Sequence, residues 1–233
     1  MNHQLTLNIP ANHRARFENF FWQNNTILHQ ALLASLSFDL HAERFFYLWG
    51  ATGSGKSHLL EASCHYLGTL GYPCAYLPLE TFIHTDPKIL ENLEQLTLVA
   101  IDDLEQIAGN PAWEETLFHC YNKVSAQEKT RLFLTASCPI ANLNIQLPDL
   151  KSRLTACVNF HISPLNEEDC LHLIQERLME RGLLLSEEVA QFIIRRFPRN
   201  TAKLIEIFDK LDQAAWKEQH RLTIPFVKKI LNL

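Results

Sequence analysis

The chain has 233 residues, of which 47% are hydrophobic and 20% are charged, so it can build one globular domain or two small ones around a buried core. Its formal net charge of -5 gives no electrostatic basis for tight, direct binding to duplex DNA, which requires clustered lysines and arginines. No apolar run approaches the roughly 20 residues of a membrane span. The six cysteines show no CxxC spacing and follow no signal peptide, so we expect reduced thiols in a cytoplasmic protein that does not contact membranes.

The first element in chain order is the short stretch QLTL, formed by Gln4, Leu5, Thr6 and Leu7. Its alternation of polar and apolar residues is typical of an extended segment. Two interpretations are open at this point. The stretch is either an edge strand of the chain's own sheet or a peptide that binds another protein in extended form.

Between residues 45 and 162, short apolar runs alternate with helical patterns, which indicates βαβ units and a parallel sheet. We expect five strands, at residues 45–49, 74–79, 97–101, 131–136 and 157–162. The crossover helices are expected at residues 57–70, 87–96, 111–126 and 149–154. The strands are almost continuously apolar, as in a sheet that helices cover on both faces.

From residue 164 onward the pattern is helical. Asn166 is expected to cap a helix that ends at Gly182, and Ser186 to cap a second helix that ends before Pro198. Two more helices are expected at residues 201–219 and 223–233. The chain should therefore comprise a flexible peptide at residues 1–10, an αβα domain at residues 11–163 and a helical domain at residues 164–233.

Residues 50–57 read GATGSGKS, directly between an apolar strand and a helical pattern, and they match the phosphate-loop pattern G-x-x-x-x-G-K-[ST]. Glycines let the backbone turn its N–H groups around phosphates, and the following helix directs its positive end at them. Lys56 is expected to reach the β and γ phosphates of ATP, and Ser57 to bind Mg²⁺. A glycine-rich turn without a ligand is the alternative. The predicted nucleotide-binding residues of this loop are Gly50, Ala51, Thr52, Gly53, Ser54, Gly55, Lys56, Ser57 and His58.

The buried strand at 97–101 runs into Asp102 and Asp103, where a phosphate-loop protein needs a carboxylate for the Mg²⁺ hydration shell. We assign that role to Asp102. Asp103 is predicted to orient the attacking water as a catalytic residue. Acidic residues also end strands simply because strand ends meet solvent, which is the alternative for both.

These parts, together with the strand LFLTAS, the run LPDLKSRL and the helical tail, resemble the AAA+ ATPases of the DnaA branch, and within it the Hda family of short DnaA-homologous regulators. The resemblance covers nearly the whole chain. It implies an α/β fold, in which a P-loop AAA+ αβα domain with a five-stranded parallel sheet precedes a small all-helical lid. One departure is Ser137, which stands where the branch usually has an acidic sensor 1 residue. Nucleotide binding is therefore expected with weak or no turnover.

The resemblance also implies roles for individual residues. Arg153 occupies the place of the family's arginine finger, a guanidinium offered to the γ-phosphate of ATP in a neighbouring subunit. Spacing alone favours a solvated i,i+4 pair of Asp149 with Arg153. Arg199 falls at the sensor 2 position, facing the nucleotide. Phe20, with its neighbours Phe17 and Phe21, would help to enclose the adenine, or would be plain core.

Gln4 to Leu7 fit the Q-L-x-L pattern with which many bacterial replication proteins bind the sliding clamp. The function implied is negative regulation of replication initiation. An adaptor holding ADP or ATP with Mg²⁺ would bind the DNA polymerase III β sliding clamp and stimulate hydrolysis of ATP on the initiator DnaA, meeting DNA only through the clamp. One alternative is a self-assembling AAA+ ATPase, such as a helicase loader, acting as a homo-oligomer. An origin-binding initiator is a further alternative. It would need a DNA-reading helix-turn-helix domain after the lid, and we expect none in the residues up to Leu233.

Overall fold

The computed structural model describes residues 15–166, 168–173, 186–197, 201–218 and 222–233. The chain divides into two compact units; the boundary in the sequence lies between Ile162 and Ser163, except that Thr52–Gly55 group with the second unit. The first unit contains a sheet and the second contains helices. Within the ranges above, none of the helices combines the length and the hydropathy needed to cross a bilayer.

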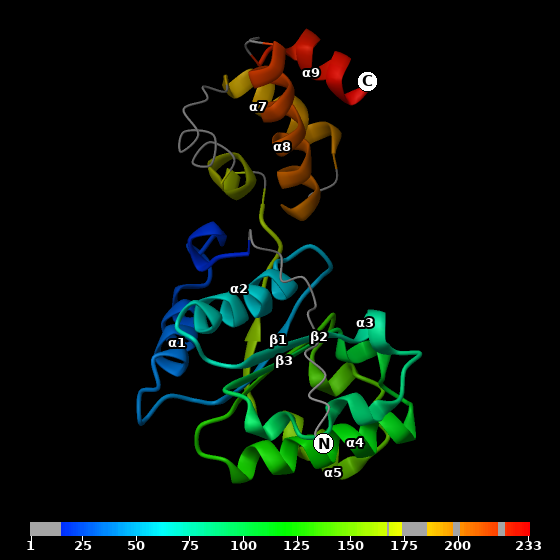
Figure 1. The fold of residues 1–233 in the computed structure, drawn as a ribbon. Helices are drawn as coiled ribbons and strands as arrows, with labels where there is room; N and C mark the ends of the chain where they lie inside the picture. The colour runs from blue at the N-terminus through cyan, green and yellow to red at the C-terminus, as the bar shows by residue number, and fades with distance from the viewer. Residues whose placement is uncertain (1–14, 167, 174–185, 198–200, 219–221) are drawn as a thin grey trace. The chain divides into compact units, whose positions relative to one another are not determined.

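A five-stranded parallel sheet forms the centre of the first unit (Figure 1). The strands lie in the order β2-β3-β4-β1-β5. Their bounds are β1 Phe45–Trp49, β2 Cys74–Pro78, β3 Leu98–Asp102, β4 Arg131–Ala136 and β5 Val158–His161. Each bound lies within one residue of its predicted place, and the predicted fold class is confirmed.

Helices cover both faces of this sheet, as Figure 1 shows. On one face lie α1, Thr26–Leu36, and α2, Lys56–Thr69; on the other lie α4, Pro111–Ala126, and α5, Pro148–Thr155. Side chains of a strand alternate between the faces, so Phe46 and Leu48 of β1 pack with the first pair while Tyr47 packs with the second. The two apolar cores are what hold the carboxyl ends of the strands in register.

One predicted crossover helix, at residues 87–96, is wrong. The segment forms two 3₁₀ turns, η2 Pro87–Leu90 and η3 Leu93–Gln95, separated by Asn92 in the left-handed region at φ 63°. A left-handed residue cannot continue an α-helix, whatever the apolar spacing around it. A short helix, α3 Leu79–Phe82, precedes these turns, and neither it nor α1 was expected from the sequence.

The second unit contains α7 Glu187–Arg196, α8 Thr201–Glu218 and α9 Ile224–Leu231. Its own core is formed by apolar residues from these helices, among them Ile193, Leu211 and Val227. Asn166 caps the segment 168–173 by accepting the Asp169 N–H at 2.8 Å, as predicted, whereas Ser186 stands at the N-cap of α7 without a side-chain capping bond. The predicted helix end at Gly182 lies outside the described residues.

Candidate nucleotide site and partner-facing helix

The loop between β1 and α2 carries the phosphate-binding pattern. Gly53 and Gly55 have φ of 83° and 99°, values that favour glycine, so the pattern's glycines are needed for the path of the backbone. At the start of the loop, the Gly50 N–H donates to the Ala136 carbonyl at 3.2 Å and joins the loop to the end of β4. The loop therefore leaves β1 at the carboxyl edge of the sheet, and α2 begins directly after it at Lys56.

Lys56 is buried, with 6% of its surface exposed. Its ammonium donates to the carbonyls of Gly50 at 2.8 Å and Ala51 at 3.1 Å. A buried ammonium group needs oxygen partners of this kind. Phosphate oxygens could accept the same hydrogen bonds and would also bring a negative charge. The hydroxyl of Ser54 is buried and has no hydrogen-bond partner among the described residues. A cationic donor and an unsatisfied hydroxyl within one glycine-rich loop fit a nucleotide's phosphates.

Asp102 lies at the end of β3 and is 1% exposed. Its carboxylate accepts the Tyr76 hydroxyl at 2.8 Å on one oxygen and a short hydrogen bond from the Thr135 hydroxyl on the other. The three side chains come from the adjacent strands β2, β3 and β4. The carboxylate is therefore fixed in direction at the same edge of the sheet as the phosphate loop. Ser57, the other predicted Mg²⁺ residue, is exposed in the first turn of α2.

Asp103 has a left-handed backbone, with φ 59° and ψ 54°, and its N–H donates to the Thr135 hydroxyl at 3.1 Å. Burial, followed by the nearby negative charge of Asp102, raises the pKa of Asp103 to about 6. The same two causes raise the pKa of Glu61, on α2, to about 7. Carboxyl groups with pKa values near neutrality exchange protons readily at physiological pH, which is the property that a general base requires.

Ser137, at the predicted sensor 1 position, is exposed just beyond β4. Its backbone N–H donates to one carboxylate oxygen of Glu105 at 3.1 Å, and the other oxygen of Glu105 is buried without a partner among the described residues. The neutral side chain at position 137 thus has a carboxylate beside it, supplied by the turn that follows β3. Sequence reasoning missed this residue because Glu105 and Ser137 are 32 positions apart.

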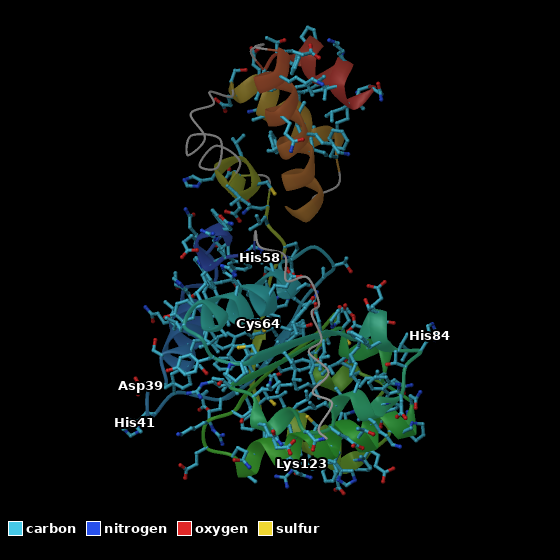
Figure 2. All side chains as sticks on the ribbon, viewed as in Figure 1. Asp39, His41, His58, Cys64, His84 and Lys123 are labelled. Carbon is cyan, nitrogen blue, oxygen red and sulfur yellow. The ribbon has the colours of Figure 1, made fainter. Side chains whose placement is uncertain are left out.

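The aromatic segment before α1 is divided between core and site. Phe17 and Phe21 are buried, and Phe17 packs in the core against Tyr66 of α2. Phe20 is half-buried, and its ring lies 6.2 Å from that of His58, which is labelled in Figure 2. The His58 ring nitrogen Nε2 lies 2.9 Å from the Arg16 carbonyl, so the segment is joined to the first turn of α2. Of the three phenylalanines, Phe20 is the partly exposed one, and its ring also lies 4.5 Å from that of Trp22.

Arg153 is exposed in the last turn of α5. Within the part of the chain that the structure describes, no ion pair joins it to Asp149, so the structure does not contain the helix pair that spacing alone favoured. Burial raises the pKa of Tyr121 to about 12, and the positive charges of Arg153 and Arg44 partly offset that rise. The Arg153 guanidinium is therefore near enough to the Tyr121 side chain of α4 to influence its pKa. Two predicted sites, Gln4 to Leu7 and Arg199, lie outside the described residues.

Two models of known protein families match the chain, one for each of its parts. A family model described as the bacterial DnaA ATPase domain matches residues 11–161. The chain belongs to this DnaA family. A second model, described as the Hda lid domain, matches residues 167–231. The expected resemblance to an Hda-like, DnaA-homologous AAA+ protein is thereby confirmed, and the two matches support a DnaA-related replication regulator.

This DnaA-type chain is also similar to one protein along its whole length and to solved structures. An uncharacterised protein from Haemophilus influenzae is 41% identical over 233 residues and covers 100% of both chains. Domain III of DnaA from Thermotoga maritima has a similar fold, with a TM-score of 0.75 and 20% identity over 94% of this chain and 95% of that one. AMPPCP-bound DnaA from Aquifex aeolicus gives a TM-score of 0.72 and 21% identity, over 89% of this chain and 70% of that one. At such identities the two structures establish the fold.

Proposed function

We propose that this chain is a negative regulator of replication initiation that stimulates hydrolysis of ATP bound to the initiator DnaA. The observation that carries the proposal is the exposed Arg153, in the last turn of α5, on a chain that matches both the DnaA ATPase domain and the Hda lid. Among the described residues no carboxylate forms an ion pair with Arg153, so its exposed guanidinium is available to a partner. Its planar, permanently charged group suits the negative charge that develops on a transferred phosphoryl group.

The chain's own nucleotide has a different role in this proposal. Lys56 and the loop glycines would hold the phosphates of ADP or ATP, and Ser57 with Asp102 would hold Mg²⁺. When bound, Mg²⁺ neutralises phosphate charge. The peptide Gln4 to Leu7 would bind the DNA polymerase III β sliding clamp, so that the protein meets DNA only through the clamp. Arg199 would contact the nucleotide from the helical lid.

The test is stimulation of the initiator's ATP hydrolysis in the presence of clamp-loaded DNA. Arginine fingers contribute roughly 10³- to 10⁵-fold to hydrolysis, so Arg153→Ala should abolish stimulation. Lys151→Ala, on the same helix, is the matched control and should stimulate like wild type. A Gln4→Ala, Leu7→Ala double variant should lose stimulation only in assays in which stimulation by the wild-type chain depends on the clamp. Full stimulation by Arg153→Ala would refute the proposal.

One observation favours a second candidate, a self-assembling ATPase such as a helicase loader. Asp103, with its pKa raised to about 6, stands at the strand end where a water-activating carboxylate is needed. In that case the purified protein alone should hydrolyse ATP at a rate per chain that rises with protein concentration. Arg153→Ala and Asp103→Ala should then each remove this turnover, whereas an adaptor would show little turnover at any concentration.

A further inference from the structure

Glu114 is a buried carboxylate that the nucleotide site does not use. It lies in the first turn of α4 and is 1% exposed. Oxygen Oε1 accepts the Gly109 N–H at 2.7 Å and the Gln146 N–H at 3.1 Å. Oxygen Oε2 accepts the Gln146 N–H at 2.9 Å and the Leu147 N–H at 2.7 Å. One side chain therefore binds three backbone donors from two segments that are distant in the sequence.

The charge of this carboxylate is compensated by these N–H groups. Among the described residues, no lysine, arginine or histidine forms an ion pair with Glu114. A buried charge is costly unless hydrogen bonds satisfy it, so the three donors and the carboxylate depend on one another. Breaking the arrangement would leave either a buried carboxylate or buried N–H groups without partners.

Two of the three donors lie directly before α5, the helix that carries Arg153. Leu147 is the N-cap residue of α5, and it has no side-chain capping bond of its own. In a capping box, a glutamate from the same helix accepts the N-cap N–H. Here Glu114 serves that purpose from the neighbouring helix, and its negative charge also faces the positive end of the α5 dipole. The start of α5 is thus fixed to α4, beside which it lies in Figure 1.

The third donor joins α5 to the acidic edge of the nucleotide site. Gly109, at φ 90°, ends the turn that follows Asp103 and Glu105, and a Cβ there would lie 3.1 Å from the side-chain nitrogen of Asn144. The turn and the loop before α5 are therefore packed together. Glu114 holds both at one point.

We infer that Glu114 is a positioning residue for Arg153, an inference that rests on the proposed function. Leu150 and Leu154 are fully buried and hold one face of α5 against the core, while Glu114 holds its start. Arg153 lies six residues beyond Leu147, roughly 9 Å along the helix at 1.5 Å per residue. A tilt of about 10° at the start would move the Arg153 backbone by roughly 1.5 Å. Misplacement by about 1 Å costs on the order of 100-fold in a catalysed step.

The experiment measures stimulation of DnaA's ATP hydrolysis with saturating full-length chain on clamp-loaded DNA. Glu114→Gln keeps the side-chain shape but turns an amide NH₂ toward at least one backbone N–H, and stimulation should fall about tenfold or more. Glu114→Asp keeps the charge on a shorter side chain and should give a smaller loss, and it replaces Glu114→Gln if that variant does not fold. In both variants, affinity for the chain's own nucleotide should stay near wild type, and the amides of Gln146 and Leu147 should exchange with deuterium faster.

A second destabilised variant separates positioning from lost stability. Leu28→Ala, in the core of the other sheet face, is the stability control. Equal losses from Leu28→Ala and Glu114→Gln at matched thermal midpoints would overturn the inference. If Arg153→Ala loses stimulation while Glu114→Gln and Glu114→Asp keep it, the inference alone fails; if Arg153→Ala keeps stimulation, the inference and the proposed function fail together.

Discussion

The carboxyl edge of the sheet and the helix α5 place their charged groups in opposite ways. At the edge, Lys56 and Asp102 are buried, and each is held by hydrogen bonds from the chain itself. On α5, Arg153 is exposed, and the buried charge that serves it, Glu114, lies on another helix. In the proposed function, the edge would hold a nucleotide inside the chain, and the helix would present Arg153 outside it.

This difference predicts which substitutions should change nucleotide affinity and protein stability together. Removing a group at the edge should change nucleotide affinity and the stability of the first unit together, because ligand and fold share the same hydrogen bonds. Removing Arg153 should change neither, because its side chain is exposed. A variant that affects both kinds of readout would show that the two regions are coupled.

The largest effect expected at the edge of the sheet is that of Lys56→Ala on the affinity for nucleotide. Charge-assisted hydrogen bonds contribute about 1.5–3 kcal/mol, so the affinity should fall roughly 10- to 100-fold. Titration with a fluorescent ADP analogue measures it. Lys88→Ala is the control, because Lys88 is exposed and pairs only weakly with Asp86 at 4.0 Å. An unchanged affinity in Lys56→Ala would show that the loop does not bind phosphate.

A smaller effect is expected from Tyr76→Phe, which removes the hydroxyl bonded to Asp102. One oxygen of a buried carboxylate then loses its donor, at a cost of about 1–3 kcal/mol to the folded protein. In the absence of nucleotide, the thermal unfolding midpoint of Tyr76→Phe should be lower than that of wild type. Added Mg²⁺ and ADP should recover part of it, since the hydration shell of the metal would supply new donors to Asp102.

Tyr47→Phe is the matched control for that variant. The Tyr47 hydroxyl donates to the Cys138 carbonyl at 2.7 Å, on the α4 face of the sheet rather than at Asp102. Its removal should lower stability by a similar or smaller amount, and Mg²⁺ with ADP should not restore that part. If both tyrosine variants respond alike to the ligand, Asp102 is not a residue of the Mg²⁺ site.

The sequence predicted the edge of the sheet better than it predicted what supports α5. Strands, phosphate loop and Asp102 follow from local patterns, because apolar runs and glycine spacing act within a few residues. The bonds from Tyr76 and Glu105 join residues 26 and 32 positions from their partners, and no local pattern encodes them. Glu114 reads as an ordinary polar residue of an amphipathic helix, and only the packing of α4 against α5 shows that it is buried.

The wrong prediction at residues 87–96 has a similar physical cause. The apolar spacing there fits a helix, yet Asn92 adopts a left-handed backbone that divides the segment into two 3₁₀ turns. Asparagine tolerates that conformation better than most residues, so the sequence permits it without requiring it. Tertiary packing decided between the two structures.

The smallest expected effect concerns pH. It tests whether ionisation of a partly buried carboxyl group near Asp102 lowers the stability of the folded chain. Because burial and Asp102 raise the pKa of Glu61 to about 7, the folded chain keeps a proton that the unfolded chain, with a pKa near 4.3, has already lost. Stability from this group is therefore complete below about pH 4 and is lost as the pH rises through 7. Glu61→Gln should flatten this part of the profile and should be more stable than wild type at pH 8 relative to pH 5.

The gain should stay under about 1 kcal/mol, because Glu61 is only partly buried and solvent screens its charge. Thermal midpoints of nucleotide-free protein between pH 5 and pH 8 measure it, with the exposed Glu128→Gln as the control. Some slope should remain in Glu61→Gln, since Asp103 titrates near pH 6 for the same reasons. A profile unchanged by Glu61→Gln would mean that Glu61 is as well solvated as Glu128 and that the slope comes from other groups, such as Asp103.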